Sequence, residues 1–89
     1  MKTTIYAVLT RYNKLTKEWD EAKRVELCKA ILYNNRISQR KYFDTMRQFR
    51  KTGEEMRAPR GMRWHLETEE GLRMAKDCNP HIASFVPFE

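Results

Sequence analysis

Several residue types that mark structural classes are scarce in this chain of 89 residues. Cysteine occurs only at Cys28 and Cys78, too few for a disulfide framework, which favours a reducing, cytoplasmic setting. Glycine and proline occur three times each, which excludes a collagen-like or low-complexity chain. The longest apolar run, Ile5 to Leu9, is far shorter than the roughly 20 residues of a membrane span, so neither a membrane helix nor a signal peptide is expected.

Charged and aromatic side chains are plentiful instead, at 34% and 11% of the chain. The aromatic residues are spread along the sequence, which indicates one folded domain over residues 1–89. Residues 36–63 hold nine basic and three acidic side chains, which accounts for the whole net charge of +6. A neutral scaffold with one cationic segment is typical of a surface that binds an anionic partner. A solvated face that keeps a small protein soluble would have the same composition.

A helix is predicted over residues 17–33. Thr16 is a suitable N-cap, acidic residues occupy the first turns, and apolar residues recur at three- and four-residue steps. Asn34 or Asn35 can end this helix, because asparagine tolerates the left-handed cap conformation. Residues 3–12 fit a strand by propensity and a helix by spacing, and both interpretations stay open.

A second helix is predicted over residues 39–52, with Ser38 as its N-cap and Gly53 as the residue after its end. One face is expected to be apolar and to consist of Tyr42, Phe43, Met46 and Phe49. Steps of 100° place on the opposite face Arg40, Lys41, Asp44, Arg47, Gln48 and Lys51. The outer face of this helix is therefore predicted to be basic.

Apolar and polar residues then alternate, which predicts a β-hairpin over residues 55–67 with its turn at Pro59-Arg60-Gly61. A short helix is predicted over residues 69–77, capped by Thr68. The tail, residues 79–89, is too apolar to remain solvated, so it either docks on the core or forms a homodimer interface.

Two helices joined by the short turn at residues 34–37, followed by a basic hairpin, resemble a helix-turn-helix domain with a wing. The stretch from Arg36 to Leu66 is similar to the small winged-helix modules common in phage and prophage genomes, and the resemblance covers about residues 20–67. It implies an α+β fold, a small helical domain with a β-hairpin wing. A full winged helix has one more helix before the wing, so either a turn replaces it or the helix at 17–33 takes its place.

The resemblance and the charge together predict a small double-stranded DNA-binding protein, a transcription regulator that reads DNA with residues 39–52 and contacts the backbone with residues 55–66. The expected nucleic-acid-binding residues are Arg36, Arg40, Lys41, Arg47, Gln48, Lys51, Arg57, Arg60 and Arg63. Among these, Arg40, Arg47 and Gln48 are expected to reach base edges, and the lysines and remaining hairpin arginines to contact phosphates.

The main alternative is a small, possibly phage-encoded, inhibitor or interaction protein that docks the same basic surface on an acidic host protein. RNA binding ranks third, because paired exposed aromatic residues are not evident. A zinc set of Cys28, His65, Cys78 and His81 lacks the close ligand pairs of structural sites, so no metal is expected. No catalytic arrangement is found, so the chain is predicted to be neither an enzyme nor a cofactor protein.

Overall fold

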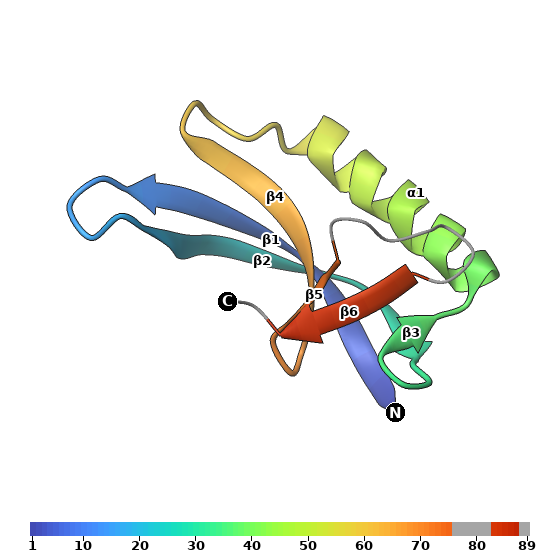
Figure 1. Cartoon of the computed structure of the whole chain (residues 1–89). Coiled ribbons are helices and arrows are strands. Elements are labelled where there is room, and N and C mark those ends of the chain that lie inside the picture. Colours follow the sequence, from blue (N-terminus) through green and yellow to red (C-terminus); the bar gives the residue numbers. More distant parts are fainter. Residues whose placement is uncertain (76–82, 88–89) are drawn as a thin grey trace.

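The computed structural model describes residues 1–75 and 83–87, which form a six-stranded antiparallel sheet and one helix (Figure 1). In chain order the elements are β1 (Lys2–Asn13), β2 (Glu18–Ile31), β3 (Arg36–Ile37), α1 (Gln39–Glu55), β4 (Met62–Thr68), β5 (Leu72–Met74) and β6 (Ala83–Pro87). The strand order is β2-β1-β4-β5-β6-β3. The predicted helical domain with a wing is therefore wrong, and so is the winged-helix resemblance, because the sheet dominates the fold.

β1 is the strand on which the sheet is built, since it pairs with both β2 and β4. The open choice at residues 3–12 is thereby settled as a strand. Ile5 and Val8 lie on opposite faces of β1 and are 0% and 1% exposed. Because both faces are covered, the apolar positions of this strand occur on both sides, which is why they also matched a helical spacing.

The helix predicted over residues 17–33 is wrong, because these residues belong mainly to β2. The pairing of β1 with β2 shifts twice, so Ala22 and Leu27 stand opposite no residue of β1 in the described register. Each inserted residue is a β-bulge, which converts the two-residue alternation of a strand into a local three-residue step. Two bulges in one strand therefore reproduce the apolar spacing of an amphipathic helix.

A tight turn reverses the chain between β2 and β3. Asn34 and Asn35 both have positive φ, at 51° and 60°. Tyr33 and Arg36 exchange backbone hydrogen bonds of 3.1 and 2.9 Å across them. Positive φ at both central residues defines a type I′ hairpin turn, for which asparagine is well suited. The left-handed preference of these asparagines is correct as predicted, but it serves a hairpin and ends no helix.

α1 covers one face of the sheet, and it begins where the sequence predicts. The Ser38 hydroxyl accepts a hydrogen bond from the Lys41 backbone N–H at 3.4 Å. The helix runs through Gly53 to Glu55, three residues further than predicted. Its inner side packs on the core through Tyr42, Met46 and Phe49. Phe43, predicted to join this apolar face, is instead 48% exposed.

The hairpin predicted over residues 55–67 is wrong in its first strand and in its pairing. Its second strand exists as β4, but β4 pairs with β1, and Met56 is the C-cap of α1. The turn is also displaced by one residue: the Met62 N–H donates to the Pro59 carbonyl at 3.0 Å, and Gly61 has a φ of 84°. A positive φ at the third turn residue requires glycine, and this requirement fixes the register of the turn.

The helix predicted over residues 69–77 is replaced by a turn and β5. The Thr68 hydroxyl accepts a hydrogen bond from the Leu72 N–H at 3.1 Å, so Thr68 caps a turn. Residues 76 and 77 lie outside the described residues. Of the tail, β6 docks within the sheet between β5 and β3. Phe85 of β6 is 0% exposed and belongs to the core with Ile5 and Leu66. Residues 79–82, 88 and 89 are outside the described part, and a homodimer stays a prediction.

Within the described ranges, no helix is long and apolar enough to cross a bilayer.

Candidate nucleic-acid interface

The outer face of α1 carries three basic side chains in line. Arg40, Arg47 and Lys51 are seven and four residues apart, which places them within about 40° of one another around the helix axis and along about 16 Å of its length. All three are exposed. We call these three side chains the α1 row. Because the opposite side of the helix packs on the core, the α1 row is held outward by a fixed scaffold.

The cations of the α1 row have little internal neutralisation. The Arg47 guanidinium lies 3.9 Å from the Asp44 carboxylate, and the two side chains are 80% and 47% exposed. An exposed pair at that distance contributes little, because water screens it. No other ion pair to the row occurs within residues 1–75 and 83–87. The row is therefore free to attract an external anion.

The charges along α1 run against the helix macrodipole. The first turn contains Arg40 and Lys41 and no acid, and the last turn contains Glu54 and Glu55 and no base. Helices favour the reverse order, by about 0.3–1 kcal/mol for each charge. The charge order at the two ends of α1 therefore costs stability within the helix.

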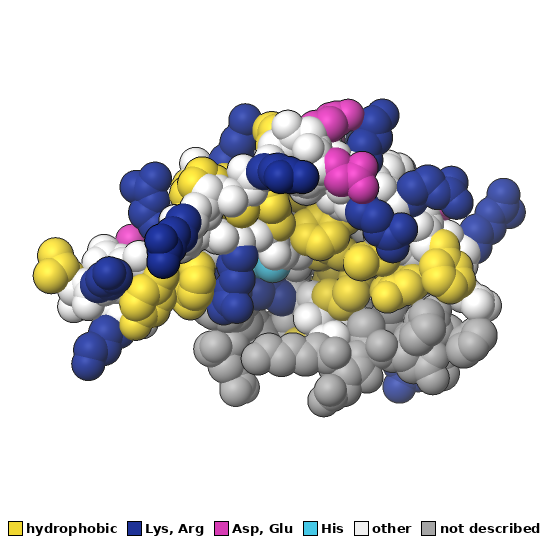
Figure 2. Space-filling model, turned by 90° about the horizontal axis from the view of Figure 1, so that it is seen from above, with side chains coloured by type: hydrophobic (Ala, Val, Ile, Leu, Met, Phe, Trp, Pro, Cys, Tyr) yellow, Lys and Arg dark blue, Asp and Glu magenta, His cyan; other side chains and the backbone are white. Residues whose placement is uncertain are grey.

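Most other predicted binding residues lie on α1 or next to it in the chain. Arg36 is exposed on β3, below the N-terminal end of α1. Lys41 is half-buried and Gln48 is exposed on the helix itself, while Arg57 and Arg60 are exposed in the loop between α1 and β4. Figure 2, which looks down on the molecule from above, shows basic side chains over α1 and also over the β1–β2 hairpin. The cationic surface is therefore centred on α1 but extends beyond it.

Arg63 is separated from the other predicted residues. It lies on β4 with its side chain on the sheet face turned away from α1, because its neighbour Trp64 faces the helix and donates to the Met56 carbonyl at 2.9 Å. The Arg63 guanidinium stacks 4.2 Å from the Trp19 ring centroid. The alternation of side chains along β4 puts Arg63 and Trp64 on opposite faces of the sheet, and the sequence shows this alternation. The sequence does not show that α1 covers the face on which Trp64 lies.

The sheet face opposite α1 is a second cluster that sequence reasoning missed. Tyr12 and Trp19 meet edge to face with ring centroids 5.3 Å apart, and Arg24 lies 4.9 Å from the Tyr6 ring centroid. Arg24 is neutralised there, since it pairs with Glu21 at 2.7 Å and Glu67 at 3.6 Å. Arg24 therefore differs from the cations of the α1 row, because carboxylates of the same chain neutralise it.

Burial and pairing shift the pKa values of two side chains on this opposite face, Glu21 and His65. The hydrogen bond from Arg24 lowers the pKa of the Glu21 carboxyl. Burial lowers the pKa of His65 below its ordinary value of 6.5, although a 3.1 Å hydrogen bond to the Glu67 carboxylate opposes that shift. His65 is therefore held neutral near pH 7, as part of the sheet and not as a cation for a partner.

The four residues considered for zinc are not gathered by the described structure. Cys28 lies on the α1 side of the sheet, where its sulfur is 3.5 Å from the Thr45 hydroxyl. His65 lies on the opposite face, beside Glu67. Cys78 and His81 are outside the described residues. A sheet therefore separates Cys28 from His65, so these two cannot share one ion.

Comparison of the chain with protein-family models, with curated proteins and with solved structures gives no match.

Proposed function

We propose that this protein binds double-stranded DNA through the outer face of α1. The observation that carries the proposal is the α1 row: three exposed cations in line on a helix whose other side is packed on a sheet. The placement of basic residues against the helix dipole supports it, because that placement costs stability and gains nothing within the described fold.

The dimensions of α1 suit the major groove. A helix with its side chains is about 10–12 Å across, and the major groove is about 12 Å wide. Arg40 and Arg47 on the outward line, with Gln48 beside them, can reach base edges, since arginine pairs with guanine and glutamine with adenine. Base reading of this kind is what a transcription regulator needs, and the cytoplasmic setting favoured by the scarce cysteines agrees with it.

Cations at the end of the helix and in the loop beyond it would contact the phosphates of the DNA backbone. Lys51 lies on the outward line, and Arg57 and Arg60 are exposed in the loop that follows α1. Lys41 and Arg36 can extend the contact at the N-terminal end. Arg63 has no part in this surface, because it lies against Trp19 on the opposite face of the sheet. Phosphate contacts from both ends would fix the register of the helix on the duplex.

Fluorescence anisotropy with a labelled duplex tests the proposal. The test variant is Arg40→Gln/Arg47→Gln/Lys51→Gln, which removes the α1 row and three positive charges. The control is Lys14→Gln/Lys17→Gln/Lys23→Gln, which removes the same charge from exposed lysines toward the far end of the β1–β2 hairpin (Figure 1). The row variant should lose roughly 100-fold or more in affinity at low salt, and the control far less. Equal losses in both would refute an interface on α1.

A second candidate function is docking of the same face on an acidic protein, and one observation favours it. Phe43 is 48% exposed on the outward side of α1, beside the α1 row. An exposed aromatic ring flanked by arginines is typical of the centre of a protein interface. Phe43→Ala separates the two functions. It should leave duplex affinity within about twofold if DNA is the partner, and it should abolish capture of a nuclease-resistant partner if a protein is.

A further inference from the structure

One edge of the sheet has no neighbouring strand in the part of the chain that the structure describes. β2 stands at the end of the strand order, so only its β1 side is paired (Figure 1). The bulges at Ala22 and Leu27 distort the earlier part of this edge. Residues 28–31, which follow the second bulge, pair regularly with β1. We call residues 28–31 the open edge.

The backbone groups of Lys29 and Ile31 point outward from the open edge. Thr4 is the partner of Lys29 on β1, and its carbonyl accepts a hydrogen bond from the Glu69 N–H at 2.9 Å, so it faces away from β2. Pairs in an antiparallel ladder alternate between bonded and unbonded, so Lys29 and Ile31 both belong to unbonded pairs. Their N–H and carbonyl groups therefore point to where a further strand would lie.

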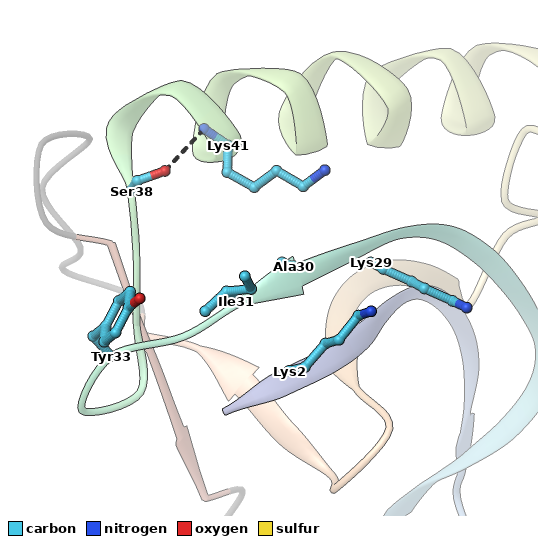
Figure 3. Close-up of a pocket in the computed structure, with 7 residues that line it drawn as sticks. All are labelled: Lys2, Lys29, Ala30, Ile31, Tyr33, Ser38 and Lys41. Carbon is cyan, nitrogen blue, oxygen red and sulfur yellow. Dashed lines mark hydrogen bonds between the residues drawn. The ribbon is translucent and has the colours of Figure 1, made fainter.

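A pocket of about 430 Å³ lies at the open edge, where the first turn of α1 stands over the end of β2 (Figure 3). Lys41 of α1 lines the pocket from the helix side of the sheet. Lys29 lines it from the opposite side, because the neighbouring Cys28 side chain faces α1, 3.5 Å from the Thr45 hydroxyl. Side chains from the two faces of a sheet can line one hollow only at its edge. The pocket therefore lies around the open edge.

The charge beside the open edge is positive on both faces of the sheet. Lys2 lies on the same face as Lys29, since it pairs with Ile31, two residues further along β2. Lys41 lies on the α1 face. None of the three lysines forms an ion pair within residues 1–75 and 83–87. The nearest acid along β2 is Glu26, on the other side of the second bulge. A strand with acidic side chains on both of its faces would complement this charge.

Two exposed apolar side chains stand at the same place. Ile31 and Tyr33 line the pocket and are 57% and 76% exposed, although side chains of this kind are usually covered. A strand added to the open edge would cover part of both. Pairing with the same edge of a second copy would set lysine against lysine, so the charge favours a different, acidic chain.

We propose that the open edge binds an extended acidic segment of another protein, which adds to the sheet as a further strand. The outward backbone groups of Lys29 and Ile31 hold its main chain, and the lysines on the two faces pair with its carboxylates. This site goes beyond duplex binding and beyond docking of the outer face of α1, because it involves a strand edge and no residue of the α1 row.

A fluorescein-labelled peptide of seven residues is the probe, with adjacent aspartate and glutamate pairs separated by single valines. Adjacent acids place carboxylates on both faces of an added strand. Anisotropy at low salt should show saturable binding to the full chain. Amide hydrogen exchange measured by NMR should slow by about tenfold or more at Lys29 and Ile31 when the peptide is bound, because these two N–H groups would donate to it.

Ile31→Pro is the test variant, because it removes an outward N–H that the pairing with β1 does not use, and edge strands tolerate proline. It should weaken peptide binding by about tenfold or more, whereas Ile31→Val keeps the N–H and should stay within about threefold. Lys29→Gln/Lys41→Gln should weaken binding by about fivefold or more. Lys14→Gln/Lys17→Gln removes the same charge from the β1–β2 turn and should have little effect. Melting temperatures verify that each variant folds.

A second probe decides the matter even if the proline variant does not fold. Peptides with N-methyl groups on alternate amides, made in both registers, cannot pair their main chain on both sides and should lose binding. Equal binding of these peptides, equal binding to a folded Ile31→Pro variant, unslowed exchange at Lys29 and Ile31, or no binding at all would overturn the proposal. A dimer that protects the same two amides without peptide would assign the edge to a second copy and would overturn it as well. Duplex affinity of the Ile31 variants should be unchanged, so failure of this site and failure of the DNA interface are separate results.

Discussion

Lys41→Glu is expected to raise the stability of the protein. Lys41 is the third residue of α1, and the Ser38 hydroxyl already accepts its N–H. Glutamate at that position completes a capping box, since its carboxylate can accept the Ser38 backbone N–H. The change also replaces an unfavourable cation in the first turn with a favourable anion.

The expected gain follows from these contributions. Removing the cation and adding the anion contribute about 0.3–1 kcal/mol each. Asp44 stands three residues along the helix, and a like charge there costs about 0.2–0.5 kcal/mol. The net gain is about 1 kcal/mol, which corresponds to about 4–8 °C in melting temperature for a domain of this size.

Thermal unfolding followed by circular dichroism measures this gain. Lys41→Gln is the matched variant, because it removes the cation without adding an acid, and it should give about half the increase. A melting temperature lowered by Lys41→Glu would refute the reasoning, because it would mean that the first turn of α1 favours a base for a reason internal to the fold.

Three further predictions concern the scaffold. Phe85→Ala should destabilise the protein by about 3–5 kcal/mol in chemical unfolding, because a side chain that is 0% exposed leaves a cavity in the core; a loss below about 1 kcal/mol would contradict the place of β6 in the sheet. Trp64→Phe should cost about 1 kcal/mol or more in the same assay, because the Met56 carbonyl loses its 2.9 Å hydrogen bond; an unchanged value would show that water replaces the indole. Burial holds the pKa of His65 below 6.5, so the unfolded chain takes up a proton that the folded chain resists. Stability should therefore be retained above pH 6.5 and fall as the pH drops below it, and His65→Gln should flatten the melting temperature between about pH 7.5 and 5.5; an equally steep slope in that variant would assign the effect to another group.

Local signals in the sequence predict local structure well. The N-cap Ser38 and the apolar residues Tyr42, Met46 and Phe49, at steps of four and three residues, locate α1 at its first residue. The left-handed tendency of Asn34 and Asn35 is also real, since both have positive φ. These features depend on neighbours a few residues away, and the sequence displays such neighbours directly.

Non-local pairing accounts for the failures. The bulges at Ala22 and Leu27 exist because β2 must follow the course of β1, and nothing near them in the sequence distinguishes a bulged strand from a helix. The partner of β4 is β1, more than fifty residues earlier, although a turn signal at Gly61 stands immediately before it. Pairing over such a distance is set by the burial of both faces of β1, which only the assembled sheet reveals.

The candidate site was predictable where it lies on one helix. Steps of 100° correctly place the α1 row on the exposed side, because helical geometry depends only on residue number. Arg63 was misplaced with it, because the face of a strand is known only when the element that covers the other face is known. Lys41 was predicted on the outer face of the helix, but it is half-buried and lines a pocket together with Lys2 of β1 and Lys29 of β2 (Figure 3).

The salt dependence of duplex binding tests the central claim most directly. Five cations are expected to contact the phosphates, namely Arg36, Lys41, Lys51, Arg57 and Arg60, which predicts a slope of about −4 to −5 in a plot of log affinity against log salt concentration. Removing three of them as Lys51→Gln/Arg57→Gln/Arg60→Gln should reduce the slope to about −2, and the hairpin control should leave it near its original value. No binding at low salt, or one slope shared by all three proteins, would contradict the account.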